Sequence, residues 1–503
     1  MEMPQRMSND SSAAPKTQPL KKAYVETYGC QMNLADGELM QGVLAARGYE
    51  IVSTPEAADV VLVNTCAIRD HAEQRVIGRV GELWRIKRDR PELVIGVTGC
   101  MAQRMGETLL RQAPYVELVM GPDGYRGLPE VLEALRPAEQ PGSGTRSGSG
   151  SDDIGQGGDS GVAQRRRALP VVGTIASRQP RGEQTAVLEF QPHENYEGLE
   201  VRRSSRVSAW VPVQRGCNYR CTYCIVPYVR GDEKNREPEQ VLDEVRRVVE
   251  EGIPEVILLG QTVNSYEHGD WDFPWLLREV ARVEGVRRVR FTSPHPNDFT
   301  PELVEVMATE PTVCRQLHLP VQSGSDRTLK RMLRRYTVAE YLSKVEMVRA
   351  AVPGIALSTD IIVAFPGETE AEYEATLDLV RRVRYDDAFL YKYSAREGTP
   401  ATRLPADQFL DAALAQERLE RLIELHRQIQ NEINAGEVGR VEEVLVERQA
   451  RSAGDVLGRT EGNKVVAFPG DESLVGHFVR VLLTGTTGAT FRGENVETLA
   501  AAG

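Results

Sequence analysis

Short apolar runs and longer amphipathic segments alternate six times between residues 207 and 393, and this alternation limits the possible folds more than any other feature. The runs expected as strands are 207–214, 255–260, 288–292, 316–321, 356–364 and 388–393. Parallel strands need a crossover connection, usually a helix, so the alternation predicts a parallel sheet. Closed barrels of this kind have eight units. Six units therefore predict an α/β fold with a central six-unit open (β/α) partial barrel, within a domain at 201–436.

The same alternation occurs on a smaller scale near the start of the chain. Apolar runs at 23–28, 58–64 and 93–98 are separated by helical patterns. Strands that alternate with helices indicate parallel βαβ units. We therefore expect an N-terminal parallel βαβ domain over residues 21–137.

The remaining segments differ in composition from these two domains. Glycine and serine make up 12 of the 20 residues at 141–160, which is typical of a flexible linker, expected over 138–200. Residues 1–20 are polar and are expected to be a disordered tail. A C-terminal small β-barrel is expected at 438–501, where short β patterns alternate with glycine-rich turns.

Composition and charge exclude some classes of protein. The formal net charge of the 503 residues is −12, which argues against a general nucleic-acid binder but not against a local basic surface. No apolar run is long enough to span a membrane, and the first 20 residues lack the apolar core of a secretory signal. We expect a cytoplasmic protein that does not bind membranes. Seven cysteines in such a chain are metal ligands or reactive groups rather than disulfides.

Three of the cysteines lie within one short segment. Cys217, Cys221 and Cys224 stand at i, i+4 and i+7, directly after Gly216. Thiolates are the usual ligands of iron–sulfur clusters, and three thiolates on a four-iron cluster leave one iron open to bind another molecule. The alternative, three ordinary buried thiols, fits poorly with such close clustering.

Three further cysteines occupy equivalent positions in the first domain. Cys30, Cys66 and Cys100 each follow an expected strand and are 36 and 34 residues apart, about one βα unit. The carboxyl ends of parallel strands share one edge of a sheet, where ligands bind. The fold is therefore expected to gather these thiols into a second three-ligand cluster site. Chance placement of small residues at strand ends is the alternative.

The strand ends of the central domain are polar. We expect a cofactor pocket there, because this edge carries the site in related barrels. Taken one at a time, each residue is more simply explained as a polar group with a structural partner. The pocket candidates are Gln261, Asn264, Gln322, Ser323 and Asp360.

A basic segment lies beside this polar edge. On a continuous helix, Arg327, Arg331, Arg334 and Arg335 would share roughly one face. Such a face suits contacts with RNA phosphates. A solvated basic face without a function is an equally good explanation.

The sequence around the cysteines resembles the methylthiotransferase family of radical S-adenosylmethionine (SAM) enzymes. The spacing Cys217-x3-Cys221-x2-Cys224 is similar to the signature of that superfamily. Family-like motifs lie at 28–33 (YGCQMN), 64–69 (NTCAIR) and 98–104 (TGCMAQR), and motifs similar to the MiaB branch lie at 221–231 (CTYCIVPYVRG), 260–266 (GQTVNSY) and 397–401 (EGTPA). The likeness covers about residues 22–135 and 203–500. The segment from 438 resembles a TRAM domain, an RNA-binding β-barrel, although its formal charge is negative.

The resemblance implies a reaction and its cofactors. It implies addition of a 2-methylthio group to N6-(dimethylallyl)adenosine at position 37 of tRNA, with two [4Fe-4S] clusters and SAM as both radical source and methyl donor. The cluster of Cys217, Cys221 and Cys224 would bind SAM, with Tyr223 beside its adenine, and the other cluster would hold the sulfur. An electron donor such as a flavodoxin or ferredoxin, and a monomeric state, are also implied.

Other functions remain open at this point. Relatives in the same family act on threonylcarbamoyladenosine in tRNA or on an aspartate of a ribosomal protein. An iron–sulfur scaffold or electron carrier would also hold two clusters, but it would not need a barrel with a polar rim. Cys314 is isolated before an expected strand, and we interpret it as structural.

Overall fold

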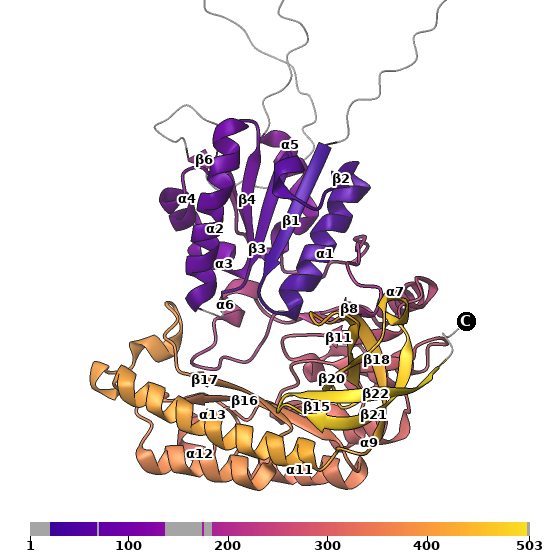
Figure 1. The fold of residues 1–503 in the computed structure, drawn as a ribbon. Coiled ribbons are helices and arrows are strands. Elements are labelled where there is room, and N and C mark those ends of the chain that lie inside the picture. Colours follow the sequence, from indigo (N-terminus) through magenta and orange to yellow (C-terminus); the bar gives the residue numbers. More distant parts are fainter. Residues whose placement is uncertain (1–20, 68–69, 136–173, 176–183, 500–503) are drawn as a thin grey trace, which may run out of the picture.

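A computed structural model describes residues 21–67, 70–135, 174–175 and 184–499. Three folded parts follow one another along the chain: a parallel sheet domain, an open barrel and a small closed barrel (Figure 1). Among the described residues, no helix is long and apolar enough to cross a membrane. The tail expected at 1–20 and the glycine- and serine-rich stretch at 141–160 lie outside the described residues.

The first domain is a seven-stranded sheet with the order β2-β1-β3-β4-β5-β7-β6. All neighbours in it are parallel except β6 and β7. Its strands are β1 (Lys21–Tyr28), β2 (Tyr49–Ile51), β3 (Val60–Thr65), β4 (Val94–Gly99), β5 (Leu118–Met120), β6 (Thr174–Ile175) and β7 (Gln184–Val187). The order 2-1-3-4-5 changes direction between β1 and β3, and ligands bind at such a switch point.

Helices flank this sheet and bury its central strands. Every residue of β3 and of β4 is buried, which explains the continuous apolar runs of these strands. The helices are α1 (Gln31–Ala46), α2 (Asp70–Asp89), α3 (Cys100–Met105), α4 (Glu107–Gln112) and α5 (Leu128–Ala134). The sequence pattern missed β2 and β5, which are only three residues long.

The linker prediction of 138–200 was wrong at its carboxyl end. Strand β7 pairs in parallel with β5 and so completes the sheet of the first domain. Farther on, Tyr196 is buried with 6% of its surface exposed, and its hydroxyl shares one proton between Oδ1 of Asp36 and the carbonyl of Pro122, both within hydrogen-bond distance. The residues after 183 therefore belong to the folded first domain and its boundary with the barrel.

The central domain contains six parallel strands in two halves. The order β14-β11-β8 forms one sheet and β15-β16-β17 forms the other, and a parallel bridge between Val289 and Val313 joins them. The strands are β8 (Ser208–Pro212), β11 (Glu255–Leu259), β14 (Arg288–Phe291), β15 (Gln316–His318), β16 (Ala356–Val363) and β17 (Asp387–Lys392). Among the described residues β8 and β17 do not pair, so the predicted open barrel of six units is confirmed.

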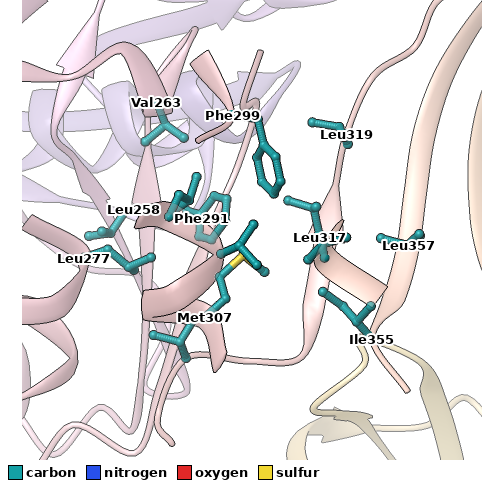
Figure 2. Close-up of a cluster of buried hydrophobic side chains, with 14 of the residues drawn as sticks. Leu258, Val263, Leu277, Phe291, Phe299, Met307, Leu317, Leu319, Ile355 and Leu357 are labelled. Carbon is teal, nitrogen blue, oxygen red and sulfur yellow. The ribbon is translucent and has the colours of Figure 1, made fainter. Parts of the chain in front are cut away.

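A continuous apolar layer lies between these strands and the helices outside them. Figure 2 shows part of it, where Leu258 and Phe291 meet Leu277 and Met307. The helices are α7 (Pro238–Glu250), α8 (Phe273–Ala281), α9 (Pro301–Thr309), α11 (Val338–Ala351), α12 (Glu370–Val383) and α13 (Ala412–Ala435). Alternate strand residues therefore face the inside of the open barrel.

The third part is the predicted small β-barrel. It is closed in the order β18-β19-β20-β22-β21 around a core that includes Phe468 and Phe491. Its strands are β18 (Val441–Gln449), β19 (Asp455–Thr460), β20 (Val465–Pro469), β21 (Phe478–Thr486) and β22 (Thr490–Thr498).

Arginines at the start of β14 attach this barrel to the central domain. Arg290 donates hydrogen bonds to the carbonyls of Thr460 and Glu461 and pairs with Glu255 at 2.8 Å. The side chains of Arg290 and Glu255 are each only 5% exposed. The small barrel therefore docks at the amino ends of the central strands, the end opposite the cysteine loop.

Replacing Arg290 with alanine should destabilise this docking. The change leaves Glu255 buried without its cation and two carbonyls without their donor, a loss of about 3–5 kcal/mol in folding free energy. Thermal unfolding and limited proteolysis of the connection after α13 would detect it. Arg480→Ala is the control, because its pair with Glu497 is exposed and contributes at most about 1 kcal/mol. Equal effects of the two changes would contradict the docking role of Arg290.

Candidate functional site

The first set of cysteines meets at the switch point of the seven-stranded sheet. Cys30 follows β1, Cys66 follows β3 and Cys100 follows β4, and these three strands are adjacent and parallel. A hydrogen bond with Cys66 is the main cause that lowers the pKa of Cys30 to about 6. Burial raises the pKa of Cys100 to about 11. The fold thus brings three thiols, far apart in sequence, to one edge.

Two glycines allow the strand ends to approach one another. A Cβ atom on Gly29 would lie 2.7 Å from the Cβ of Cys66, and one on Gly99 would lie 2.4 Å from Oδ1 of Asn64. Gly99 also has a φ of +92°, which disfavours any other residue. Nδ2 of Asn64 donates to the carbonyl of Asn33 at 2.7 Å. Glycines and buried amides together fix the backbone that presents the thiols.

The second set lies in a loop between β9 (Gln214–Arg215) and α6 (Val226–Arg230). Gly216 opens this loop with a φ of +76°, and a Cβ there would lie 2.0 Å from the carbonyl oxygen of Asp232. The Sγ atom of Cys217 lies 3.2 Å from Oγ1 of Thr262. Cys224 donates its backbone N–H to the carbonyl of Cys221 at 3.0 Å, and burial raises the pKa of the Cys224 thiol to about 12.

The two sets of cysteines adjoin one another across the domain boundary. Ile225, the residue after Cys224, packs with Cys100 and with Ala67, the residue after Cys66. Helix α6 lies against α3, below the edge of the seven-stranded sheet (Figure 1). The structure therefore places both sets of thiols at one interface.

Two buried ion pairs hold this interface together. Arg230 pairs with Asp36 at 2.6 Å, with side chains 2% and 0% exposed, and its Nε donates to Sγ of Cys100 at 3.2 Å. Arg215 pairs with Asp123 at 2.6 Å, and both side chains are 2% exposed. Because these arginines bracket the loop of the second set, they fix that loop against the first domain.

Three buried polar atoms at the strand ends have no hydrogen-bond partner among the described residues: Oε1 of Gln261, Nε2 of His295 and Oε1 of Gln322. Burial lowers the pKa of His295 to about 2, so the ring is neutral, and it stacks on Tyr219 at 3.8 Å. Buried polar atoms are almost always hydrogen-bonded. These three atoms therefore suit a polar ligand.

The other pocket candidates have different surroundings. Asn264 is engaged by the backbone of His295, to which it both donates and accepts. Ser323 is fully buried against Thr376 of α12. Tyr223 packs in an apolar cluster with Met332 and Phe365.

Asp360 lies inside the open barrel, on β16. Its carboxylate is 3.5 Å from Nε2 of His318.

The predicted arginine face does not form. Helix α10 (Asp326–Arg331) ends after six residues, so Arg334 and Arg335 lie beyond it. Arg327 pairs with Glu372, and Arg331 donates to Oε1 of Gln408. A shared helix face was therefore wrong, because the helix stops where the chain turns inward.

Arg334 has turned toward the second set of cysteines. It is 8% exposed, and it donates to Sγ of Cys221 at 3.7 Å and to the carbonyl of Pro320 at 3.0 Å. Arg335 is exposed. These contacts between arginines and thiols could not be predicted from the sequence, because no spacing rule connects residues more than 100 positions apart.

The chemistry of the donors fits iron–sulfur clusters. Each set supplies three thiols, and an arginine donates to one sulfur in each. Among the described residues, no group of three His, Cys, Asp or Glu residues is arranged to hold a single metal ion. A four-iron cluster is larger than one ion, so its thiolate ligands stand farther apart than those of a single ion.

Cys314 lies away from both sets. It lies two residues before β15, at the amino ends of the strands, where it is buried near Arg290. Its backbone N–H donates to the carbonyl of Val289. This position agrees with a structural role.

Solved structures share the overall fold of much of this chain. The radical SAM methyltransferase TsrM from Kitasatospora setae, solved with cobalamin and a [4Fe-4S] cluster, matches with a TM-score of 0.54 at 16% identity, covering 77% of this chain and 78% of that one. The cobalamin-dependent SAM radical enzyme OxsB matches with a TM-score of 0.51 at 13% identity, covering 82% and 58%. At these identities the likeness shows the fold alone.

Family models and relatives match nearly the whole chain. Residues 22–121 match the uncharacterized protein family UPF0004, 211–380 the radical SAM superfamily and 436–496 the TRAM domain. The tRNA-2-methylthio-N(6)-dimethylallyladenosine synthase of Moorella thermoacetica is 43% identical over 477 residues, 94% of this chain and 97% of that protein. The synthase of Carboxydothermus hydrogenoformans is 41% identical over 470 residues, 92% and 97%. The chain therefore belongs to the family of tRNA-2-methylthio-N(6)-dimethylallyladenosine synthases, within the radical SAM superfamily.

Proposed function

We propose that this chain adds a methylthio group to C2 of N6-(dimethylallyl)adenosine at position 37 of tRNA. The observation that carries the proposal is the meeting of two three-cysteine sets at one interface, where Ile225 packs against Cys100. The names of relatives at about 40% identity support the substrate. The TRAM match over 436–496 supports an RNA substrate.

The cysteines would hold two [4Fe-4S] clusters. Bound clusters and SAM supply the electron, the radical needed at an unreactive aromatic C–H bond, and the sulfur and methyl groups. Cys217, Cys221 and Cys224 would hold one cluster, and Cys30, Cys66 and Cys100 the other. Three thiolates leave one iron of each cluster open. The arginine that donates to one sulfur in each set would stabilise the thiolate charge.

The polar strand ends would bind SAM. Gln261, His295 and Gln322 each present a buried atom that has no partner in the described part of the chain, and polar groups of SAM can satisfy these atoms. Asn264 and Ser323 act on the pocket through the backbone and helix that they hold. Tyr223 and Asp360 border the same region from the cysteine loop and from the barrel interior.

The domain boundary also limits access of water. Met32 and Ala35 of α1 pack on Ile257 and Leu259 inside the barrel, next to Cys30. Exclusion of water protects reactive intermediates from side reactions. We include in the proposal a flavodoxin or ferredoxin as electron donor and a monomeric enzyme.

Iron content tests the two-cluster proposal. Reconstituted wild-type protein should contain about eight irons per chain, and Cys217→Ala and Cys66→Ala should each lose about four. Cys314→Ala is the matched control, since it removes a buried thiol outside both sets and should keep all the iron. Loss of iron in Cys314→Ala, or none in Cys66→Ala, would contradict the assignment.

Nucleoside analysis tests the reaction. In tRNA from a strain that lacks this protein, 2-methylthio-N6-(dimethylallyl)adenosine should disappear and its precursor without sulfur should accumulate. Wild-type protein should restore the product, and Cys66→Ala should not. Loss of a methylthio-threonylcarbamoyl nucleoside instead would favour the alternative tRNA substrate. An unchanged nucleoside profile in a strain with no related enzyme would contradict the proposal.

Removing the charge of Arg230 should loosen the interface between the two sites. Arg230→Met leaves Asp36 buried and unpaired, which should lower the free energy of unfolding by about 3–5 kcal/mol. Arg220→Met, in the loop before α6, is the control, because the pair of Arg220 with Asp232 is exposed. The double variant Arg230→Met with Asp36→Leu should be more stable than Arg230→Met alone, as measured by calorimetry. A double variant that only adds the two losses would show that the charges are not coupled.

A further inference from the structure

Two large aromatic side chains are exposed on β17, the last strand of the open barrel. Phe389 is 47% exposed and Tyr391 is 40% exposed. Leu390, between them, packs on the apolar core that the helices cover. Because successive strand residues point to opposite sides, Phe389 and Tyr391 face the inside of the open barrel.

These rings form one wall with residues of the two neighbouring strands. Phe389 is in register with Asp360, and Tyr391 with Ile362. The Phe389 ring meets His318 of β15 edge to face, with 5.7 Å between ring centroids, and His318 lies 3.5 Å from the Asp360 carboxylate. We call His318, Asp360, Ile362, Phe389 and Tyr391 the β15–β17 wall. It combines two exposed aromatic rings with one pair of polar groups.

The wall leads to the second set of cysteines. Ile362 packs in the cluster that contains Tyr223 of the cysteine loop. After β17, Ala401 donates its N–H to the carbonyl of Thr222 at 2.8 Å. The chain after the wall thus binds the loop of the second set.

Other parts of the barrel interior are covered. Met32 and Ala35 of the first domain lie on Ile257 and Leu259, and the small barrel covers Arg290. The interior face of β17, by contrast, leaves Phe389 and Tyr391 47% and 40% exposed, whereas the cavity of about 380 Å³ between β17 and α13 lies at the edge of the strand on the α13 side. Among the described residues, the wall is therefore a part of the interior that remains accessible.

We propose that the β15–β17 wall receives the N6-(dimethylallyl)adenine of the tRNA substrate, with Phe389 and Tyr391 against the base and its apolar side group. This inference rests on the proposed function. A base must leave its stack to reach a buried reaction site, and proteins hold such bases by stacking on aromatic rings. The dimethylallyl group has no polar atom, so its contact with exposed aromatic surface favours binding of the modified base over adenine, which carries a bare amino group at this position.

The proposed role of the wall can be tested by measuring the dissociation constants of two anticodon stem-loop RNAs with the cluster-loaded, full-length protein. One RNA carries N6-(dimethylallyl)adenosine at position 37 and the other carries adenosine, and no reductant is present, so neither reacts. Wild-type protein should bind the first RNA more tightly. Phe389→Ala should weaken this binding about tenfold, the scale of one stacking contact, and bring the two dissociation constants together. Phe389→Leu, which keeps apolar surface, should lose less.

Trp271→Ala is the matched control. Trp271 is an aromatic with 43% exposure on the separate hairpin of β12 (Glu267–His268) and β13 (Trp271–Asp272), and its removal should leave both dissociation constants unchanged. Circular dichroism and iron content confirm that each variant is folded and loaded.

Several outcomes would contradict the proposed role of the β15–β17 wall. Unchanged discrimination in both Phe389→Ala and Tyr391→Ala would do so, and so would a selective loss of SAM binding, which would assign the wall to the cofactor. Wild-type protein that does not discriminate between the RNAs would also overturn it. Nucleoside analysis separates these results from failure of the proposed function, because an enzyme that forms the methylthio product in cells retains that function whatever the wall binds.

Discussion

The placement of both cysteine sets depends on the buried charge of Arg230. Its guanidinium pairs with Asp36 in the first domain and donates to the thiol of Cys100, although Arg230 itself belongs to the segment after the second set. A buried charge without its partner costs several kcal/mol. The first domain therefore cannot separate from the cysteine loop without exposing these groups to water or leaving them buried without their partners. The pair of Arg215 with Asp123 imposes the same condition on the other side of the loop. Charge and shape together therefore fix the position of the first domain relative to the cysteine loop.

This arrangement explains why the barrel is open. A closed barrel of eight strands fills its own interior with side chains. Here six strands leave a side that other parts of the chain can approach, and two of them do: α1 covers β11 near Cys30, and the small barrel covers β14 at Arg290. Within the part of the chain that the structure describes, the wall on β15, β16 and β17 remains accessible, and two aromatic rings are exposed on it. Because the barrel is open, the cysteine-bearing edge of the first domain and the strands of the central domain border the same space.

Much of the fold and of the cysteine placement could be predicted from the sequence, because both follow from the alternation of apolar runs and helical patterns. Cys30, Cys66 and Cys100 each follow an apolar run, and parallel strands end at one edge, so their approach follows from topology. The contacts of Arg230 could not be predicted, because they join residues 130 and 194 positions apart. Strand β7 was missed because four residues carry little pattern and follow a linker-like stretch. Asn264 and Ser323 were correctly placed near strand ends, but a polar residue type does not reveal that the backbone already uses it.

The basic residues show most clearly how sequence and structure differ. Arg334 looked like part of a phosphate-binding face, yet it is buried and donates to Cys221. Arg230 donates to Cys100 in the same way. Thiolates inside a protein need nearby positive charge, because burial alone disfavours their charged form. A cation near a cysteine motif in a chain of this family is therefore as well explained by thiolate charge as by RNA. The net charge of the chain cannot distinguish thiolate stabilisation from RNA binding, because the same basic side chains can serve either role.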